Sequence, residues 1–146
     1  MRFTPHHRGD LKANGKAKDE HLRRQHLHEQ LKGLWNRPPL SSHRYLFETE
    51  EDDEVLIVRP MGNFGYVPVV SSRPSVVAAL RITLLRPEPP GNIVTQGGDL
   101  ANRLTTLLDA PKVPNHPNAL PMGAVPAAGE SPSFCLLEDD NLTPPA

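Results

Sequence analysis

The stretch Asp19–Trp35, with the sequence DEHLRRQHLHEQLKGLW, shows the clearest helical pattern of the chain. Spacings of three and four residues place four large apolar side chains on one face: Leu27, Leu31, Leu34 and Trp35. Leu22 lies at the edge of that face, and the opposite face carries Arg23, Glu29 and Gln30. Asp19 suits the N-cap position, and the prolines after Trp35 end the helix. We therefore predict a helix over residues 20–35.

Segments with strand character flank this helix on both sides. Val55–Val58 and Tyr66–Val70 are rich in β-branched and aromatic residues, and Met61–Gly65 between them resembles a hairpin connection. Val76–Leu85 alternates regularly over ten residues and is the strongest predicted strand. Met1–Leu11 can form a short strand, although its proline and histidines weaken the pattern.

A second amphipathic helix is predicted from Asp99 to about Ala110. Its leucines form one apolar stripe: Leu100, Leu104, Leu107 and Leu108. Asp99 is expected to cap the first turn, where an acidic side chain also suits the helix dipole, and Pro111 ends the helix.

Prolines dominate the part of the chain that follows this helix. Residues 111–133 hold six of the 17 prolines and show no apolar periodicity, which favours a mobile or extended linker. Phe134–Leu137 is a short predicted strand that leads into Glu138, Asp139 and Asp140. We expect an α/β (α+β) domain over 1–110 with a small mixed sheet packed against two helices, then the Pro-rich segment, then an acidic C-terminal segment over 134–146.

Composition limits the classes of protein that the chain can represent. With 146 residues it can form one domain around one core. The lone Cys135 excludes an internal disulfide and favours a reducing compartment. The longest apolar run is too short to cross a bilayer and no export signal is evident, so we expect a soluble, cytoplasmic protein without a membrane partner.

The net charge of −1 conceals a basic front part of the chain. Residues 1–44 hold ten Lys and Arg against four acidic residues, whereas residues 48–54 hold six acidic residues. Such an asymmetry suits a polyanionic partner, and a well-solvated surface explains it equally simply. The candidate phosphate-binding residues are Lys12, Lys16, Lys18, Arg23, Arg24 and Arg103.

Acidic residues form the candidate catalytic site. Mg²⁺ prefers carboxylate and water oxygens, and Asp99, Asp139 and Asp140 are the predicted ligands, with Asp99 and Asp140 as catalytic residues. Each also has a simpler interpretation, since Asp99 can be a helix cap and the acidic triplet a solvated tail. Asp109 lies about 15 Å from Asp99 along a helix, so it is assigned a structural role.

The order of these segments resembles the RusA type of Holliday-junction resolvase, a family common in prophages. Its pattern is Asp-x-Asp-Asn opening a helix, Asp-Ala ending it and Asp-Asp later. The residues that match, over about 76–140, are Asp99, Asn102, Asp109, Ala110, Asp139 and Asp140. The N-terminal strand, Asn-Gly loop and basic helix echo it more weakly. The resemblance implies a homodimeric, Mg²⁺-dependent endonuclease that cuts branched DNA in recombination and repair, with Asn102 and Asp109 in structural roles.

The chain departs from the family pattern at important positions. Ala101 replaces the second aspartate, and a methyl group cannot bind a metal. Thr105 replaces a lysine suited to phosphate charge, and the chain ends soon after Asp140. Glu138 is a candidate substitute ligand. Losing one electrostatic donor can lower a rate by about 10²–10³, so an endonuclease of this composition is expected to be weakened or inactive.

Two alternatives remain open at the level of sequence. The basic N-terminal half can bind nucleic acid without any catalysis, using phosphate contacts alone. The histidines at positions 6, 7, 21, 26 and 28 can bind a metal, although no zinc-binding spacing is present and solvated helical histidines are the favoured interpretation.

Overall fold

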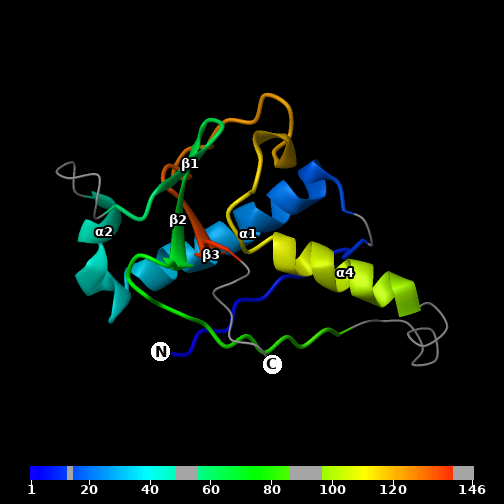
Figure 1. The fold of residues 1–146 in the computed structure, drawn as a ribbon, viewed down its shortest axis with the longest axis horizontal. Helices are drawn as coiled ribbons and strands as arrows, with labels where there is room; N and C mark the ends of the chain where they lie inside the picture. The colour runs from blue at the N-terminus through cyan, green and yellow to red at the C-terminus, as the bar shows by residue number, and fades with distance from the viewer. Residues whose placement is uncertain (13–14, 49–55, 86–96, 140–146) are drawn as a thin grey trace.

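The computed structural model describes residues 1–12, 15–48, 56–85 and 97–139. Within these ranges the chain forms three α-helices and one three-stranded sheet (Figure 1). The elements are α1 (Ala17–Trp35), α2 (Tyr45–Glu48), β1 (Arg59–Met61), β2 (Phe64–Val70), α4 (Gly97–Asp109) and β3 (Ser133–Leu137), with 3-10 turns at Leu40–His43 and Pro117–Ala119.

The sheet has the order β1-β2-β3 and mixes both strand directions. β1 and β2 form an antiparallel hairpin whose turn contains Gly62 at φ 58°, a backbone conformation that glycine adopts without strain. β2 and β3 run parallel, with Tyr66 beside Ser133 and Val70 beside Leu137. The predicted α+β class with a small mixed sheet is therefore confirmed.

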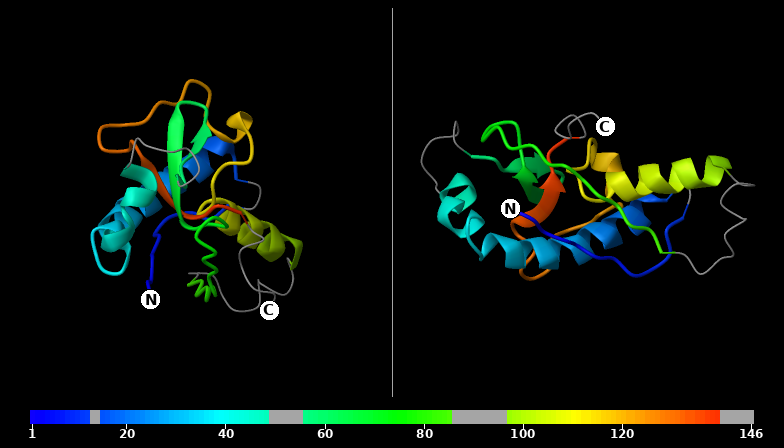
Figure 2. Two further views of the ribbon diagram at one scale, coloured as in Figure 1. Left: turned by 60° about the vertical axis from the view of Figure 1, so that its left-hand side comes forward. Right: turned by 90° about the horizontal axis from the view of Figure 1, so that it is seen from below.

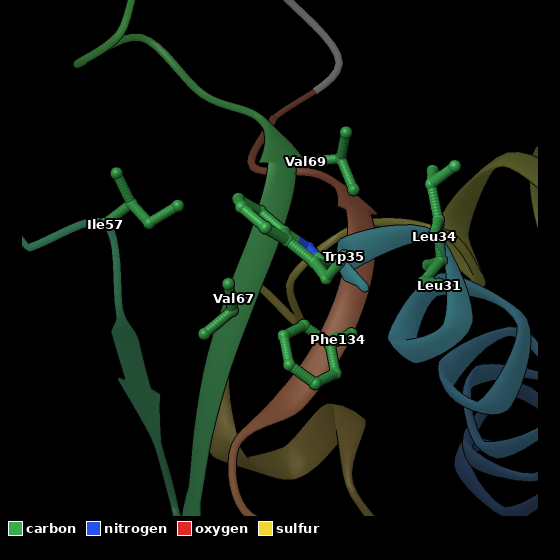
Figure 3. Close-up of a cluster of buried hydrophobic side chains, with 7 residues drawn as sticks. All are labelled: Leu31, Leu34, Trp35, Ile57, Val67, Val69 and Phe134. Atoms are coloured by element: carbon green, nitrogen blue, oxygen red, sulfur yellow. The ribbon is translucent and has the colours of Figure 1, made fainter. Parts of the chain in front are cut away.

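Helix α1 covers one face of the sheet and forms the main core. Trp35 lies at the centre of this core, between side chains of β2, β3 and α1 (Figure 3). The buried members of the cluster are Leu31, Leu34, Trp35, Ile57, Val67, Val69 and Phe134. The predicted helix and its apolar face are thus confirmed, and Leu22 at the edge is more than half exposed.

The opposite face of the sheet is covered by the Pro-rich segment. Phe64, Tyr66 and Cys135 point to this side and pack against Val113 and Leu120. Because both faces are covered, six of the seven residues of β2 are buried. The segment after α4 therefore contributes side chains to the core, a role that its composition did not predict.

The prediction of a strand over Val76–Leu85, the strongest strand pattern in the sequence, was wrong. These residues follow β2 but pair with no strand among the described residues, and nearly all of their side chains are exposed. The turn after β2 explains the difference: the amide of Val76 donates to Ser71 O, and Ser75 adopts φ 54°. The chain leaves the sheet at this turn (Figure 1), and an alternating pattern cannot form a strand without a partner.

Three further predicted boundaries also differ. Of the predicted strand Val55–Val58, residues 56–58 form no strand and Val55 lies outside the described residues. The first strand, β1, starts at Arg59. Residues 1–12 form no strand either. Asp19 is not the N-cap: the helix begins at Ala17, and the Asp19 carboxylate accepts a bond from the Lys16 amide at 3.3 Å from within the first turn. The second predicted helix is confirmed as α4, which begins two residues earlier than expected.

In the part of the chain that the structure describes, no helix combines the length and the apolar composition that crossing a bilayer requires.

Candidate nucleic-acid interface

Helix α4 carries three of the six residues on which the resemblance rests, Asp99, Asn102 and Asp109. Asp99 lies in its first turn. Ala101 and Asn102 are exposed one turn further on, and the Thr105 hydroxyl donates to Ala101 O at 3.1 Å. The positions that depart from the family pattern, Ala101 and Thr105, therefore lie together on the exposed surface of α4.

β3 meets α4 at the end opposite Asp99. The carbonyl of Pro111 accepts bonds from the amides of Leu136 and Leu137 at 2.8 and 3.0 Å, and Lys112 forms a parallel bridge with Leu137. The first turn of α4 points away from the sheet (Figures 1 and 2). Ten residues of helix separate Asp99 from Asp109 by about 15 Å. Asp99 is thus far from the point at which β3 contacts the helix end.

Asp109 takes part in a local ion pair at the end of α4. Its carboxylate lies 2.8 Å from the ammonium group of Lys112, and its carbonyl accepts a bond from the guanidinium of Arg24. These contacts join the end of α4 to Lys112, which forms the bridge with Leu137, and to α1. Asp109 therefore has a structural role.

Glu138 is enclosed at the end of β3, and its two carboxylate oxygens are already engaged. One oxygen accepts from the Arg59 guanidinium, and the other accepts from the hydroxyls of Ser71 and Ser72 and from the Ser72 amide. Burial raises the pKa of Glu138, but these hydrogen bonds outweigh it and lower the pKa to about 2. The carboxylate connects β1 to the end of β2, and its oxygens are not available as a substitute metal ligand.

The predicted Mg²⁺ site stays a prediction, because the side chain of Asp99 lies outside the described residues. Asp139 is exposed after β3, whereas Asp140 lies outside the described residues. Within the described ranges no group of three or more His, Cys, Asp or Glu side chains is placed to hold a metal ion. The Ala101 side chain offers no oxygen, the Glu138 carboxylate is engaged, and β3 meets α4 at the end opposite Asp99.

A basic loop packs against the middle of α4. The amide of Gly15 lies 3.5 Å from the hydroxyl of Thr106, and a β-carbon at Gly15 would lie only 2.7 Å from Thr106 Cγ2. Only glycine allows so close an approach. Lys12, Lys16 and Lys18 on either side of this contact are all exposed. The contact thus brings three lysines next to α4.

Two of the predicted phosphate-binding residues are placed differently. Arg23 and Arg24 are buried, with 4% and 5% of their surfaces exposed. Arg23 donates to Asp10 O, and Arg24 pairs with Glu20 and contacts two backbone carbonyls. They hold the N-terminal segment and α4 against α1, so the assignment as nucleic-acid-binding residues is corrected. Arg103, the sixth predicted residue, is partly buried on α4.

Sequence reasoning missed the residues that organise this region. The Asn-Gly loop was seen as a turn, but its closeness to Thr106 depends on residues 91 positions apart. The partners of Glu138 come from two segments, β1 and the end of β2, and nothing in their local sequence marks them. The one feature of the sequence that could have indicated the contact with Thr106 was Gly15, a glycine between lysines.

Comparison with known proteins finds no significant match for this chain, whether to a protein-family model, to a curated protein or to a solved structure.

Proposed function

We propose that this protein binds branched DNA through helix α4 and the exposed lysines around the start of α1, Lys12, Lys16 and Lys18, as a RusA-like protein in which Mg²⁺-dependent cleavage is weak or absent. The proposal combines the family resemblance of α4 and β3 with the alternative of nucleic-acid binding without catalysis. Lys12, Lys16 and Lys18 contact phosphates, and the exposed polar surface of α4 lies against the DNA.

The observation that carries the proposal is the contact of Gly15 with Thr106. It brings the exposed lysines of the loop beside the helix that holds the resemblance pattern. Lysines concentrated next to a helix surface neutralise phosphates and release counterions, which gives binding without sequence readout. Lys12 contacts Asp19 only at 3.5 Å with more than half of its side chain exposed, and such a pair gives way readily to a phosphate.

The residues at the positions of the family's catalytic site support the loss of cleavage. Ala101 and Thr105 remove an oxygen ligand and a positive charge, and the Glu138 carboxylate is held by Arg59, Ser71 and Ser72. Phosphodiester hydrolysis needs a cation or an equivalent charge at the developing negative oxygens. A protein with this surface is expected to hold DNA rather than cut it.

Binding to a four-way junction and to a duplex of equal length, in EDTA and over a range of salt, tests the proposal. We expect preference for the junction and a steep decrease of affinity with salt. Lys16→Glu and Lys18→Glu should each lower affinity and reduce the salt slope by about 1. Arg37→Glu is the matched control, because Arg37 is an exposed basic residue beyond the other end of α1. Equal effects of all three variants, or a flat salt response, would refute this interface.

Cleavage is tested separately with Mg²⁺ and with Mn²⁺. Wild type should leave the junction intact, and Ala101→Asp combined with Thr105→Lys should restore cleavage if the ancestral site lay on α4. Both positions are exposed, so the substitutions should not affect folding. Efficient cleavage by wild type that is lost in Asp99→Asn would show that a metal site exists and that this part of the proposal is wrong.

The proposal includes a homodimer, since a four-way junction has approximate two-fold symmetry that a two-fold dimer matches. Exposed apolar side chains at Val77, Leu80 and Ile82 provide surface that association would bury. Light scattering of the full chain should give twice the mass of one chain, and Ile82→Asp should reduce it. A monomer that still binds junctions would remove the dimer from the proposal.

A further inference from the structure

Gln30 holds the part of the N-terminal segment around His6 on α1. The Gln30 side chain donates to His6 O at 2.8 Å and accepts from the His6 amide at 3.0 Å, so its amide group pairs with the backbone as a neighbouring strand would. His26 lies one turn before Gln30 on the same face of α1. The residue after His6 is therefore brought directly to His26.

His7 and His26 face each other through the same ring nitrogen. Their Nδ1 atoms lie 3.3 Å apart, and their ring centroids lie 5.3 Å apart. Two imidazole nitrogens bound to one tetrahedral zinc at about 2.0–2.1 Å lie about 3.3 Å apart, so the observed separation matches the bite of a zinc ion.

The histidine pair opens into a cavity of about 500 Å³. Glu29 and Glu130 line the same cavity with negative charge, and Arg8 lines it with one positive charge. The described residues bring no third metal-binding side chain into reach, so an ion bound here would take two ligands from the protein and complete its coordination with water. Imidazole ligands select zinc and neighbouring transition metals over Mg²⁺, which prefers oxygen ligands.

We propose that His7 and His26 form a zinc-binding site that fastens the N-terminal segment to α1. The site is separate from the DNA-binding surface, because it uses the histidine pair and not the loop lysines. Binding of an ion to the folded form alone raises stability by mass action, and the segment carrying Arg2 and Arg8 becomes fixed.

The test is calorimetric titration of the full chain, free of any histidine tag, with ZnCl₂ at neutral pH. We expect one bound ion, a higher melting temperature in zinc, and no response to MgCl₂. His7→Ala and His26→Ala should each lower zinc affinity by more than about tenfold, and the double variant should lose little more. Affinity should also decrease at about pH 5, where protons compete for imidazole.

Matched controls are His43→Ala and His116→Ala, whose side chains are exposed and lie outside this cavity. Both should bind zinc as wild type does. Melting curves without zinc establish that the His7 and His26 variants fold, since His26 is exposed and His7 only partly covered. Unchanged zinc affinity in the folded His7→Ala and His26→Ala variants would overturn the proposal, as would the absence of zinc binding by wild type.

Discussion

The Nδ1 atom of His28 accepts a hydrogen bond from the backbone amide of Phe134 at 2.9 Å, which joins the middle of α1 to β3 across 106 residues. The two rings also stack, with centroids 5.6 Å apart. A nitrogen that accepts carries no hydrogen, so the hydrogen of the neutral ring lies on Nε2 and is donated to Gly129 O at 3.1 Å. One buried histidine thus holds both the strand and the loop that precedes it.

His28→Ala should destabilise the protein by about 2–4 kcal/mol, because it leaves a cavity and a buried amide of Phe134 without a partner. Chemical denaturation followed by circular dichroism measures the change. His43→Ala, at an exposed histidine whose Nδ1 bonds Pro39 O within its own turn, should change stability by less than about 0.5 kcal/mol. A loss below about 1 kcal/mol for His28→Ala would contradict the proposed importance of this contact.

Acid should weaken the protein through Glu138. Its pKa is lowered to about 2 in the folded state, so its ionised form stabilises the fold above the ordinary glutamate pKa. That contribution is lost as the pH falls from the ordinary value towards about 2. Glu138→Gln should therefore be less stable at neutral pH and show a flatter decrease on acidification. Glu48→Gln, at an exposed glutamate paired with Arg44, serves as control and should retain the wild-type profile.

Gly15→Ala should push the basic loop away from α4. The new methyl group would lie 2.7 Å from Thr106 Cγ2, an overlap that typically costs about 1–3 kcal/mol. Thr106→Ser removes that methyl and keeps the hydroxyl, so the double variant should recover most of the stability and, under the proposed function, junction affinity. Additive losses in a double-mutant cycle would show that the two residues do not share this contact.

Cys135 should be unreactive in the folded protein. It is buried, and burial raises the pKa of its thiol, so almost no thiolate is present at neutral pH. A chromogenic disulfide reagent should label it slowly without denaturant and quickly in guanidinium chloride. Labelling at the same rate in both conditions would show that β3 opens readily or does not pack as described.

Local patterns in the sequence predicted the elements whose cause is local. Both long helices were expected within a few residues of their observed ends, since apolar spacing and flanking prolines act over one or two turns. β2 and β3 were also predicted, because their apolar residues are likewise neighbours in the sequence. Val76–Leu85 shows the limit: its alternation matches a strand, but the turn at Ser71–Ser75 takes it away from any partner.

Contacts with distant segments decide the roles of Arg23, Arg24 and Glu138. Arg23 and Arg24 count as basic residues in the sequence, yet both side chains are buried. Arg23 donates a hydrogen bond to Asp10 O, and Arg24 donates one to Asp109 O. Glu138 belongs to an acidic run, but Arg59 and two serines occupy its oxygens. Charge alone does not reveal which side chains are already engaged.

The sequence by itself determined the α+β class, the helices α1 and α4, and the concentration of lysines near the N-terminus, because composition and periodicity are properties of neighbouring residues. Only the tertiary structure decided that the Pro-rich segment covers the second face of the sheet, that Gly15 contacts Thr106, and that His7 meets His26. Each of these depends on two segments far apart in the chain, and their approach follows from the packing of the whole core.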